Sequence, residues 1–161
     1  MVEGTLPVVL EDGGVVLRRA ERDDLPSIIE LLAADQLAAR RESAQDLTPY
    51  EAAFTTIEAD PAHLLIVAAA DHTVVGTFQL SFIPGLARRG ALRAQIEAVR
   101  VAGPWRGRGL GAAMMRWAIE ESRRRDCALV QLTSDKSRLD AHRFYERLGF
   151  AASHDGFKLT L

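Results

Sequence analysis

The sequence predicts an α/β (α+β) fold, in which a mixed, mostly antiparallel central sheet of six to seven strands carries helices on both faces. Three strand-like segments follow one another between residues 63 and 101 with no helix between them, which implies antiparallel pairing. A strand–helix–strand unit then spans residues 91 to 133 and implies one parallel neighbour. The 161 residues, 48% of them hydrophobic, are expected to form a single domain over residues 1–161.

The first half of the chain is expected to begin with a strand and two helices. After a short lead-in, residues 15–20 are typical of a strand. Residues 23–26 (Asp-Asp-Leu-Pro) indicate a helix entrance, because acidic residues and proline suit a first helical turn. A second helix should begin at residues 48–51 (Thr-Pro-Tyr-Glu), a capping box with proline at the first helical position. It should end before Pro61.

The second half should supply most of the strands and two further helices. A long helix is expected from Leu110, because apolar residues then recur on one face. A shorter helix should end at Gly149. Strands are expected over residues 63–70, 73–82, 91–101, 128–133, 150–153 and 157–161.

Composition and charge indicate which classes of molecule the protein is expected to bind and where in the cell it is expected to be. Acidic and basic residues nearly balance, at a net charge of −2, so no long-range field draws in nucleic acid or an anionic membrane. The four histidines show no metal-ligand spacing, and no metal is expected. The single cysteine, Cys127, predicts a small buried residue in a reducing compartment. With neither a leader nor an apolar run long enough to span a bilayer, the chain is expected to be cytoplasmic.

A glycine-rich turn between a strand and a helix is the strongest functional signal. The strand ends at Val101, and the helix opens within Gly107–Gly111. Helix N-termini present unpaired N–H groups and a positive dipole end, and glycines let a phosphate approach without a Cβ in the way. Arg106 and Arg108 add positive charge beside the turn. These features predict a phosphate-binding turn.

A dinucleotide fingerprint is an alternative interpretation of the same turn. Gly107-x-Gly109-x-x-Ala112 satisfies it formally, and Asp135 lies where a ribose-binding acid is found. Against it, Glu97 and Arg100 interrupt the strand before the turn, whereas a parallel nucleotide-binding sheet has nearly continuous apolar strands. Pro104-Trp105 also lengthens the turn, and only about fifty residues follow, too few for a two-half dinucleotide domain.

Two motifs, Arg106-x-x-Gly109-x-Gly111 and Tyr145-x-x-x-Gly149-Phe150, resemble those of the GNAT superfamily of N-acetyltransferases. Arg106-x-x-Gly109-x-Gly111 resembles its acetyl-CoA-binding motif, and the strand before it ends Val99-x-Val101, as is common there. Residues 144–150 resemble its C-terminal signature, Tyr-x-x-x-Gly-Phe. The resemblance covers residues 95–150 and implies an acyl-CoA N-acyltransferase-like fold.

The resemblance implies a role for each matching position. Main-chain groups of the turn would hold the pyrophosphate of coenzyme A, and Val99 and Val101 would hold the pantetheine. Tyr145 aligns with the tyrosine that protonates the departing thiolate. Arg138 stands where relatives carry a cofactor-binding asparagine, and it either reaches a phosphate or faces solvent. The residues expected to bind the cofactor are Val99, Arg100, Val101, Arg106, Gly107, Arg108, Gly109, Leu110, Gly111, Ala112 and Arg138.

Glu97 is the candidate general base. Strand alternation predicts that it lies on the same face as Val99 and Val101. The substrate amine must lose a proton before it attacks, and a nearby carboxylate can take that proton directly or through a water. The alternative is a solvated or salt-bridged strand residue, with Arg93 on the same face as partner.

The resemblance implies an acetyl-CoA-dependent N-acetyltransferase that acetylates a primary amine of a small molecule by direct transfer in a ternary complex. The alternatives are a non-catalytic acyl-CoA-binding or regulatory module and the dinucleotide-binding enzyme. The second helix lines the acceptor cleft in relatives, so Tyr50 and Phe54 either touch the substrate or pack in the core. Arg40-Arg41 and Arg88-Arg89 either favour an acceptor bearing a carboxylate or are solvated. Dimers are common among relatives, and a homodimer is possible on that ground.

Overall fold

The described part of the chain, in a computed structural model, is residues 6–10, 14–35 and 42–161. It forms two compact units that divide between Gln131 and Leu132. The helices and strands of the first unit, in chain order, are β1 (Val8–Val9), β2 (Val15–Arg19), α1 (Leu25–Ala33), α2 (Thr48–Ala59), β3 (His63–Ala70), β4 (Thr73–Ile83), α3 (Ala87–Gly90), β5 (Arg93–Val101) and α4 (Leu110–Arg124). Strand β6 (Leu129–Leu132) ends at the division, and α5 (Leu139–Arg147) belongs to the second unit.

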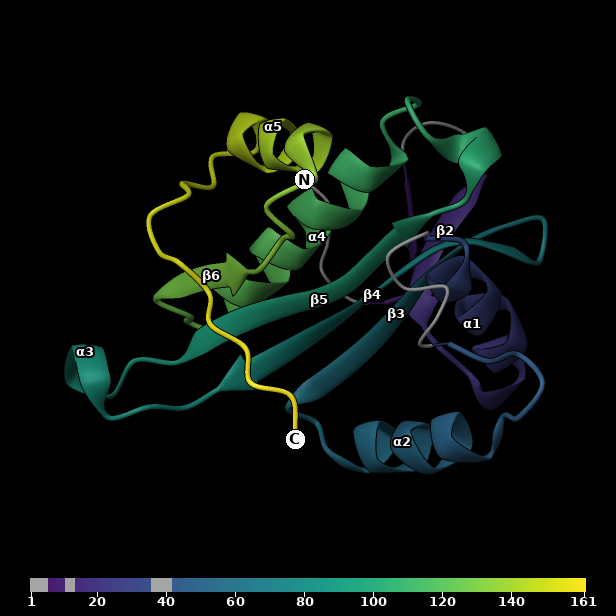
Figure 1. Cartoon of the computed structure of the whole chain (residues 1–161), viewed down its shortest axis with the longest axis horizontal. Coiled ribbons are helices and arrows are strands. Elements are labelled where there is room, and N and C mark those ends of the chain that lie inside the picture. Colours follow the sequence, from purple (N-terminus) through teal and green to yellow (C-terminus); the bar gives the residue numbers. More distant parts are fainter. Residues whose placement is uncertain (1–5, 11–13, 36–41) are drawn as a thin grey trace. The chain divides into compact units, whose positions relative to one another are not determined.

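A six-stranded sheet in the order β1-β2-β3-β4-β5-β6 organises the described residues. Each pair from β1 to β5 is antiparallel, and β3, β4 and β5 form the long centre of the sheet (Figure 1). Next to β5, the Ala128 amide donates to the Leu92 carbonyl at 2.8 Å, and the Gln131 side chain donates to that of Gln95 at 2.7 Å. The residue numbers of the two strands therefore increase in the same direction, so β6 runs parallel to β5. This confirms the predicted mixed, mostly antiparallel sheet. Strand β1 was not anticipated, because two residues show no periodicity.

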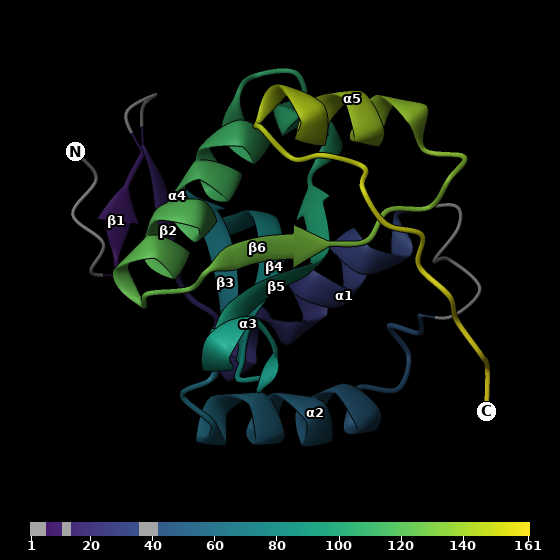
Figure 2. The same ribbon diagram turned by 90° about the vertical axis from the view of Figure 1, so that its left-hand side faces the viewer.

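Helices cover both faces of the central strands. Figure 2 shows α4 on one side of β3–β5 and α2 on the other. On the α4 side, the Trp117 ring lies 6.1 Å from the Phe78 ring, and both side chains are buried. A Cβ at Gly76 of β4 would lie 2.9 Å from the Met114 sulfur, so this glycine lets α4 pack closely on the sheet. The predicted apolar face of α4 is thus confirmed.

The entrance to α1 is held by an ion pair. The guanidinium of Arg18 in β2 donates to both carboxylate oxygens of Asp24, at 2.6 and 2.8 Å, and the Glu21 amide donates to the same carboxylate at 2.7 Å. Burial by itself would raise the pKa of Asp24, but these hydrogen bonds outweigh it, and the pKa lies below its ordinary value. The expected acidic helix entrance is therefore present, and it also ties α1 to the sheet.

Helix α2 starts where it was expected but with a different cap. Its N-cap is Leu47, so the predicted capping box of Thr48 and Glu51 does not form. Instead, the Asp46 carboxylate accepts a hydrogen bond from the Thr48 amide at 3.0 Å. An aspartate one residue earlier satisfies the same kind of orphan N–H group.

A β-bulge interrupts the pairing of β4 with β5. Thr77 pairs with Arg100 and Gln79 pairs with Glu97, so two residues of β5 face the single Phe78. The extra residue, Ala98, has a φ of +53°, a left-handed conformation that is unusual for alanine. The bulge shifts the alternation of side chains along the rest of β5.

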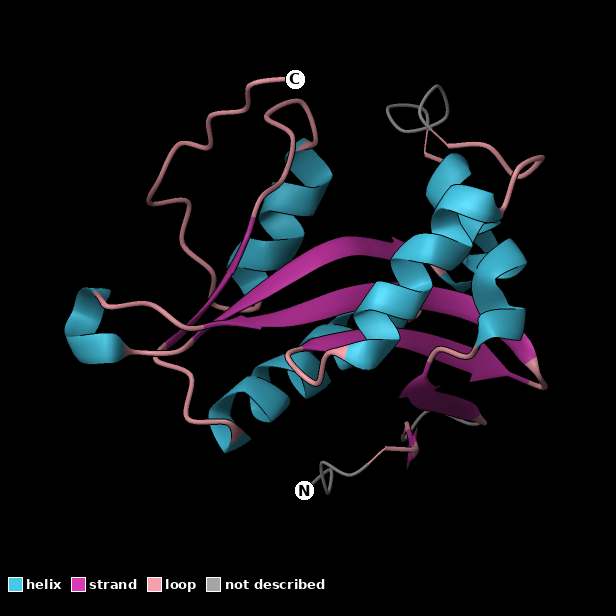
Figure 3. Ribbon diagram, turned by 90° about the horizontal axis from the view of Figure 1, so that it is seen from below, coloured by secondary structure: helices cyan, strands magenta, loops and turns pink. Residues whose placement is uncertain are grey.

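The β4–β5 hairpin extends beyond the rest of the sheet and carries α3 at its tip (Figures 1 and 3). Arg88 and Arg89 in α3 have φ values of +54° and +61°, so this short element is not a regular helix. Leu86, at the start of the tip, is fully exposed.

The second unit contains α5 and an extended C-terminal segment. Helix α5 stops as predicted, since Gly149 adopts a φ of +94° just beyond it. The strand pair predicted over residues 150–153 and 157–161 is wrong, because neither segment is assigned to a strand. Phe157, Leu159 and Leu161 alternate as a strand would but are exposed. Alternation alone does not make a strand when no partner strand covers one face.

Candidate active site

The turn before α4 has an open floor of glycine main chain. Gly107 and Gly109 have φ values of +71° and +84°, and Gly109 is the N-cap of α4. No atom lies within 4 Å of a Cβ built on either glycine, so the space above the main chain is free. A glycine N-cap has no side chain to accept from the N–H groups of Leu110, Gly111 and Ala112 in the first turn. These donors therefore favour an anion from outside the chain.

Two arginines flank this turn and are held in place by their neighbours. Arg106 donates from Nε to the Val101 carbonyl at 3.0 Å. The Arg108 guanidinium lies 4.7 Å from the centre of the Trp105 ring, within range of a cation–π interaction. Both arginines are exposed, so their charge is available to a ligand.

The end of β5 offers main-chain carbonyls that already have one donor each. The Val99 carbonyl accepts from Arg100 at 2.9 Å, as the Val101 carbonyl does from Arg106. Each carbonyl oxygen retains a second lone pair. Arg100 also lies 3.3 Å from the carboxylate of Asp35, and both side chains are 14% exposed. The side chain of Arg100 is thus engaged with the end of α1, and its predicted cofactor contact stays a prediction.

The bulge places Glu97 and Val101 on opposite faces of the sheet, which corrects the prediction from alternation. Glu97 pairs with Gln79, whose side chain faces α1 and α2. Val101 pairs with Gly76, which faces Met114 of α4. Two residues opposite one add a half-period between these positions.

The Glu97 side chain is exposed and available for chemistry. Within the described part of the chain, its carboxylate has no hydrogen bond or ion pair, and none joins it to Arg93. The salt-bridged alternative is therefore not observed. An exposed carboxylate on the face of α1 and α2 can accept a proton from a bound amine or from a water.

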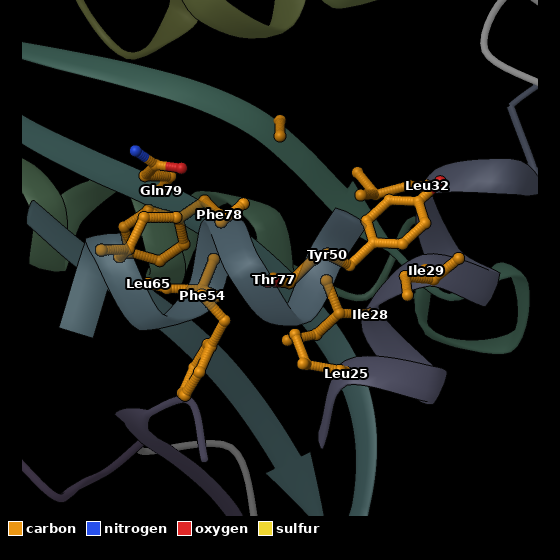
Figure 4. A pocket seen from close by; sticks show the side chains of 13 residues that line it. Leu25, Ile28, Ile29, Leu32, Tyr50, Phe54, Leu65, Thr77, Phe78 and Gln79 are labelled. Carbon is orange, nitrogen blue, oxygen red and sulfur yellow. The ribbon is translucent and has the colours of Figure 1, made fainter. Parts of the chain in front are cut away.

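A cavity lies beside Glu97 on the same face. Its volume is about 180 Å³, and its walls come from α1, α2, β3, β4 and β5 (Figure 4). Ala98, the residue after Glu97, lines it, as does the Glu97 pairing partner Gln79. Tyr50 and Phe54 also line it, while Phe54 is at the same time packed in the core. The core alternative stated for α2 thus holds for Phe54, and its contact with the substrate stays a prediction.

Sequence reasoning missed the sheet residues of this cavity. Leu65, Thr77 and Gln79 come from strands whose burial gave no reason to single them out. Gln79 carried the one available signal, because a glutamine within an otherwise apolar strand indicates a position that faces solvent or a ligand.

In the second unit, Tyr145 is held between two aromatic rings. Its ring centre lies 5.1 Å from that of Phe144 and 5.8 Å from that of Phe150, both in edge-to-face geometry. Arg138 is the N-cap of α5. Hydrogen bonds from the Ser137 hydroxyl and amide hold the pKa of Asp135 below its ordinary value. Asp135 is thus engaged with its own turn.

The remaining candidates are the cysteine, the two arginine pairs, possible metal ligands and possible membrane-spanning helices. Cys127 is half-buried, and burial raises the pKa of its thiol, so it is not an activated nucleophile. Arg88 and Arg89 are exposed at the tip of the β4–β5 hairpin, whereas Arg40 and Arg41 lie outside the described residues. No group of His, Cys, Asp and Glu suited to a metal occurs among the described residues. None of the described helices is long and apolar enough to cross a bilayer.

Comparison with known proteins identifies similar chains. The sequence model of the Acetyltransferase (GNAT) family matches residues 25–150. A solved structure from Bacillus halodurans C-125, described as a transcriptional regulator, shares 43% identity and a TM-score of 0.89. That match covers 91% of this chain and 99% of the other.

The antiparallel pairing from β1 to β5 also disagrees with the parallel sheet of a dinucleotide-binding domain.

Two curated relatives are N-acetyltransferases. The aminoalkylphosphonate N-acetyltransferase of Salmonella typhimurium is 39% identical over 67 residues, which are 42% of this chain and 44% of that protein. The glucosamine 6-phosphate N-acetyltransferase of Trypanosoma brucei brucei is 38% identical over 88 residues, which are 55% and 58% of the two chains. The chain thus spans about half the length of the curated relatives it matches.

Proposed function

Since the chain belongs to the GNAT acetyltransferase family, we propose that it transfers the acetyl group of acetyl-coenzyme A to a primary amine of a small molecule, by direct transfer in a ternary complex. The observation that carries this proposal is the open glycine turn at the start of α4. Its free N–H groups and two flanking arginines fit a diphosphate.

The residues of the first unit supply the positions that the cosubstrate needs. The pyrophosphate would be held by the main chain from Arg106 to Gly111 and by the first turn of α4. The pantetheine would run along β5, where the Val99 and Val101 main chain is proposed to hold it. Arg138 is proposed to contact a phosphate. When bound, acetyl-CoA supplies an activated thioester, whose carbonyl a preorganised N–H donor polarises more strongly in the transition state.

The proposed chemistry uses two side chains. A primary amine arrives as an ammonium ion, and Glu97 accepts a proton from it directly or through a water. The free amine nitrogen attacks the thioester carbon, so that a C–N bond forms and the C–S bond breaks. Tyr145 donates a proton to the departing sulfur and regains one from the nitrogen. In sum, the ammonium ion and the thioester give an amide, a thiol and one released proton.

The wider expectations stay predictions. A single domain over residues 1–161 is supported by the family model, which spans residues of both compact units. We also propose a cytoplasmic location, on the ground of the single cysteine, and a homodimer, because dimers are common among relatives.

The test of the chemistry is thiol release from acetyl-CoA in the presence of amines. Tyr145→Phe should lower turnover with little effect on coenzyme A affinity, and unchanged turnover would show that the acid role is wrong. Glu97→Gln should steepen the pH dependence of activity, because only the amine that is already deprotonated in solution can then react. A profile that follows the wild type would remove Glu97 from the reaction.

A non-catalytic acyl-CoA-binding regulatory module is the second candidate. It is favoured by the Bacillus halodurans chain, which is described as a transcriptional regulator and is 43% identical. A protein that binds coenzyme A but releases no thiol with any amine supports this second candidate over the first.

A further inference from the structure

The cavity beside Glu97 is lined almost wholly by apolar side chains. Ile29 and Leu32 come from α1, Phe54 from α2, and Leu65 from β3 (Figure 4). Ile57 of α2 also lines it. The volume of about 180 Å³ exceeds that of an apolar cavity of about 150 Å³ that is known to take up benzene. A six- to eight-carbon apolar group therefore fits here.

The polar side chains that line the cavity have their hydrogen bonds elsewhere. The Thr77 hydroxyl donates to a main-chain carbonyl of β3 at 2.9 Å. The Tyr50 hydroxyl donates to the Glu42 carboxylate at 2.8 Å. The side-chain amide of Gln79 donates to the Ser81 hydroxyl at 3.3 Å. Because the Thr77 and Tyr50 hydroxyls donate within the protein, the remaining polar capacity comes mainly from the Gln79 amide, and the rest of the lining offers apolar surface to an occupant.

Charge around the cavity favours a cation beside Glu97. None of the lining residues that the structure describes is charged. Arg22 stacks on the Phe54 ring at 5.4 Å, and Arg100 is paired with Asp35. The Glu42 carboxylate lies at Tyr50, and next to the lining residue Ala98 the carboxylate of Glu97 has no hydrogen bond or ion pair with the described residues. An occupant with an ammonium group beside Glu97 and an apolar body complements this arrangement.

We propose that the acceptor is a primary amine whose apolar body, about the size of a phenyl ring or a six-carbon chain, fills this cavity and presents its ammonium group to Glu97. This inference rests on the proposed acetyltransferase function. It sets this chain apart from the two curated relatives, whose names specify a phosphonate and a phosphate acceptor. A phosphate needs cationic or N–H partners, and the lining residues that the structure describes include no arginine or lysine.

The first experiment compares acceptors by thiol release from acetyl-CoA. The panel is a series of linear amines from methylamine to hexylamine, with phenethylamine, 2-aminoethylphosphonate and glucosamine 6-phosphate. We expect kcat/KM to rise roughly fourfold per added methylene until the cavity is full. Phenethylamine should exceed both anionic amines at least tenfold. A flat series, or a preference for an anionic amine, overturns the inference while leaving the acetyltransferase function intact.

The second experiment fills the cavity from its mouth. Ala53 of α2 lines the cavity and is exposed, whereas Ala52 beside it is exposed but does not line it. Ala53→Phe should lower kcat/KM for phenethylamine at least tenfold more than it lowers that for methylamine. Ala52→Phe should change neither value. Equal losses for both amines in Ala53→Phe, or equal effects of the two substitutions, overturn the inference.

Calorimetry separates a failure of this inference from a failure of the proposed function. Phenethylamine is titrated into the wild type and both variants with coenzyme A present. If it binds, and only Ala53→Phe weakens the binding, while no amine gives thiol release, the cavity assignment stands and the enzyme function fails. If thiol is released with some amines but phenethylamine binding is equal in all three proteins, the inference fails and the function stands.

Discussion

Substitution of Gly109 by alanine tests the open turn at the start of α4 most directly. Its φ of +84° disfavours any L side chain, by about 1–2 kcal/mol for a left-handed residue. A Cβ at this position meets no atom within 4 Å, so no steric clash adds to that penalty. In a chain of this size, about 1 kcal/mol lowers Tm by roughly 2–4 °C. The substitution should therefore leave a folded protein whose turn carries a methyl group where the anion is proposed to sit.

The effect on coenzyme A should be larger than the effect on folding. Loss of one hydrogen bond to a charged phosphate oxygen costs about 1.5–3 kcal/mol, which is at least a tenfold loss of affinity. Coenzyme A at 100 times the wild-type Kd stabilises the wild type by about 2.7 kcal/mol. At the same concentration and a tenfold weaker Kd, the Gly109→Ala protein gains only about 1.4 kcal/mol. Thermal unfolding with and without coenzyme A measures both quantities.

Gly14 provides the matched control. Its φ is +86°, and a Cβ there also meets no atom within 4 Å, but it lies in the β1–β2 connection rather than beside α4. Gly14→Ala should lose a similar amount of stability and keep the full stabilisation by coenzyme A. If Gly109→Ala keeps the same coenzyme A shift as Gly14→Ala, the diphosphate is not bound at this turn and the reasoning is refuted.

Three further predictions concern stability and reactivity. Asp24→Asn should lower the free energy of unfolding at pH 7 by about 2 kcal/mol, since the charged hydrogen bonds to Arg18 are lost. The folded pKa of Asp24 is lowered, so its contribution is present above the unfolded pKa of about 3.9 and is lost as pH falls through the folded value. Urea unfolding across pH should therefore show the gap between wild type and variant closing in acid, and a constant gap contradicts the assignment. Ala98→Gly should raise the free energy of unfolding by about 0.5 kcal/mol, because glycine accepts the left-handed conformation at φ +53°; a lower urea midpoint argues against strain there. Cys127 should react with iodoacetamide more slowly than free cysteine at pH 7.5, because burial raises its thiol pKa, and a faster reaction shows the opposite.

The spacing of apolar residues and the positions of proline and glycine predicted most of the fold. Pro49 and Pro61 bracket α2, the apolar face from Leu110 defines α4, and Gly149 ends α5. These signals are local, so they survive in any tertiary context. The C-terminal strand pair failed for the opposite reason. A strand requires a partner, and the alternation of Phe157 with Leu159 specifies no partner.

The glycine turn that is proposed to bind the diphosphate was predictable from the sequence. The cavity proposed for the acceptor and the face on which Glu97 lies were not. Gly107 and Gly109 stand out because their spacing is local to one turn. The face of Glu97 was not predictable, because the bulge at Ala98 leaves no glycine or proline in the sequence to announce it. The cavity residues Leu65 and Gln79 are brought to Glu97 by cross-strand register, which a single sequence does not reveal.

The extra residue Ala98 divides β5 into a segment that faces the proposed acceptor site and a segment that packs on α4. Upstream of Ala98, positions 95 and 97 belong to the layer where amine choice is proposed to be made. Downstream, position 101 belongs to the layer that packs on α4. A randomised library at the cavity positions 65 and 79, which share this layer, should therefore alter substrate preference without loosening the helix on the far side. Deletion of Ala98 would restore simple alternation, so that the side chains on one side of this position would move to the opposite face of the sheet. Natural variants should therefore tolerate substitution at this position far better than deletion.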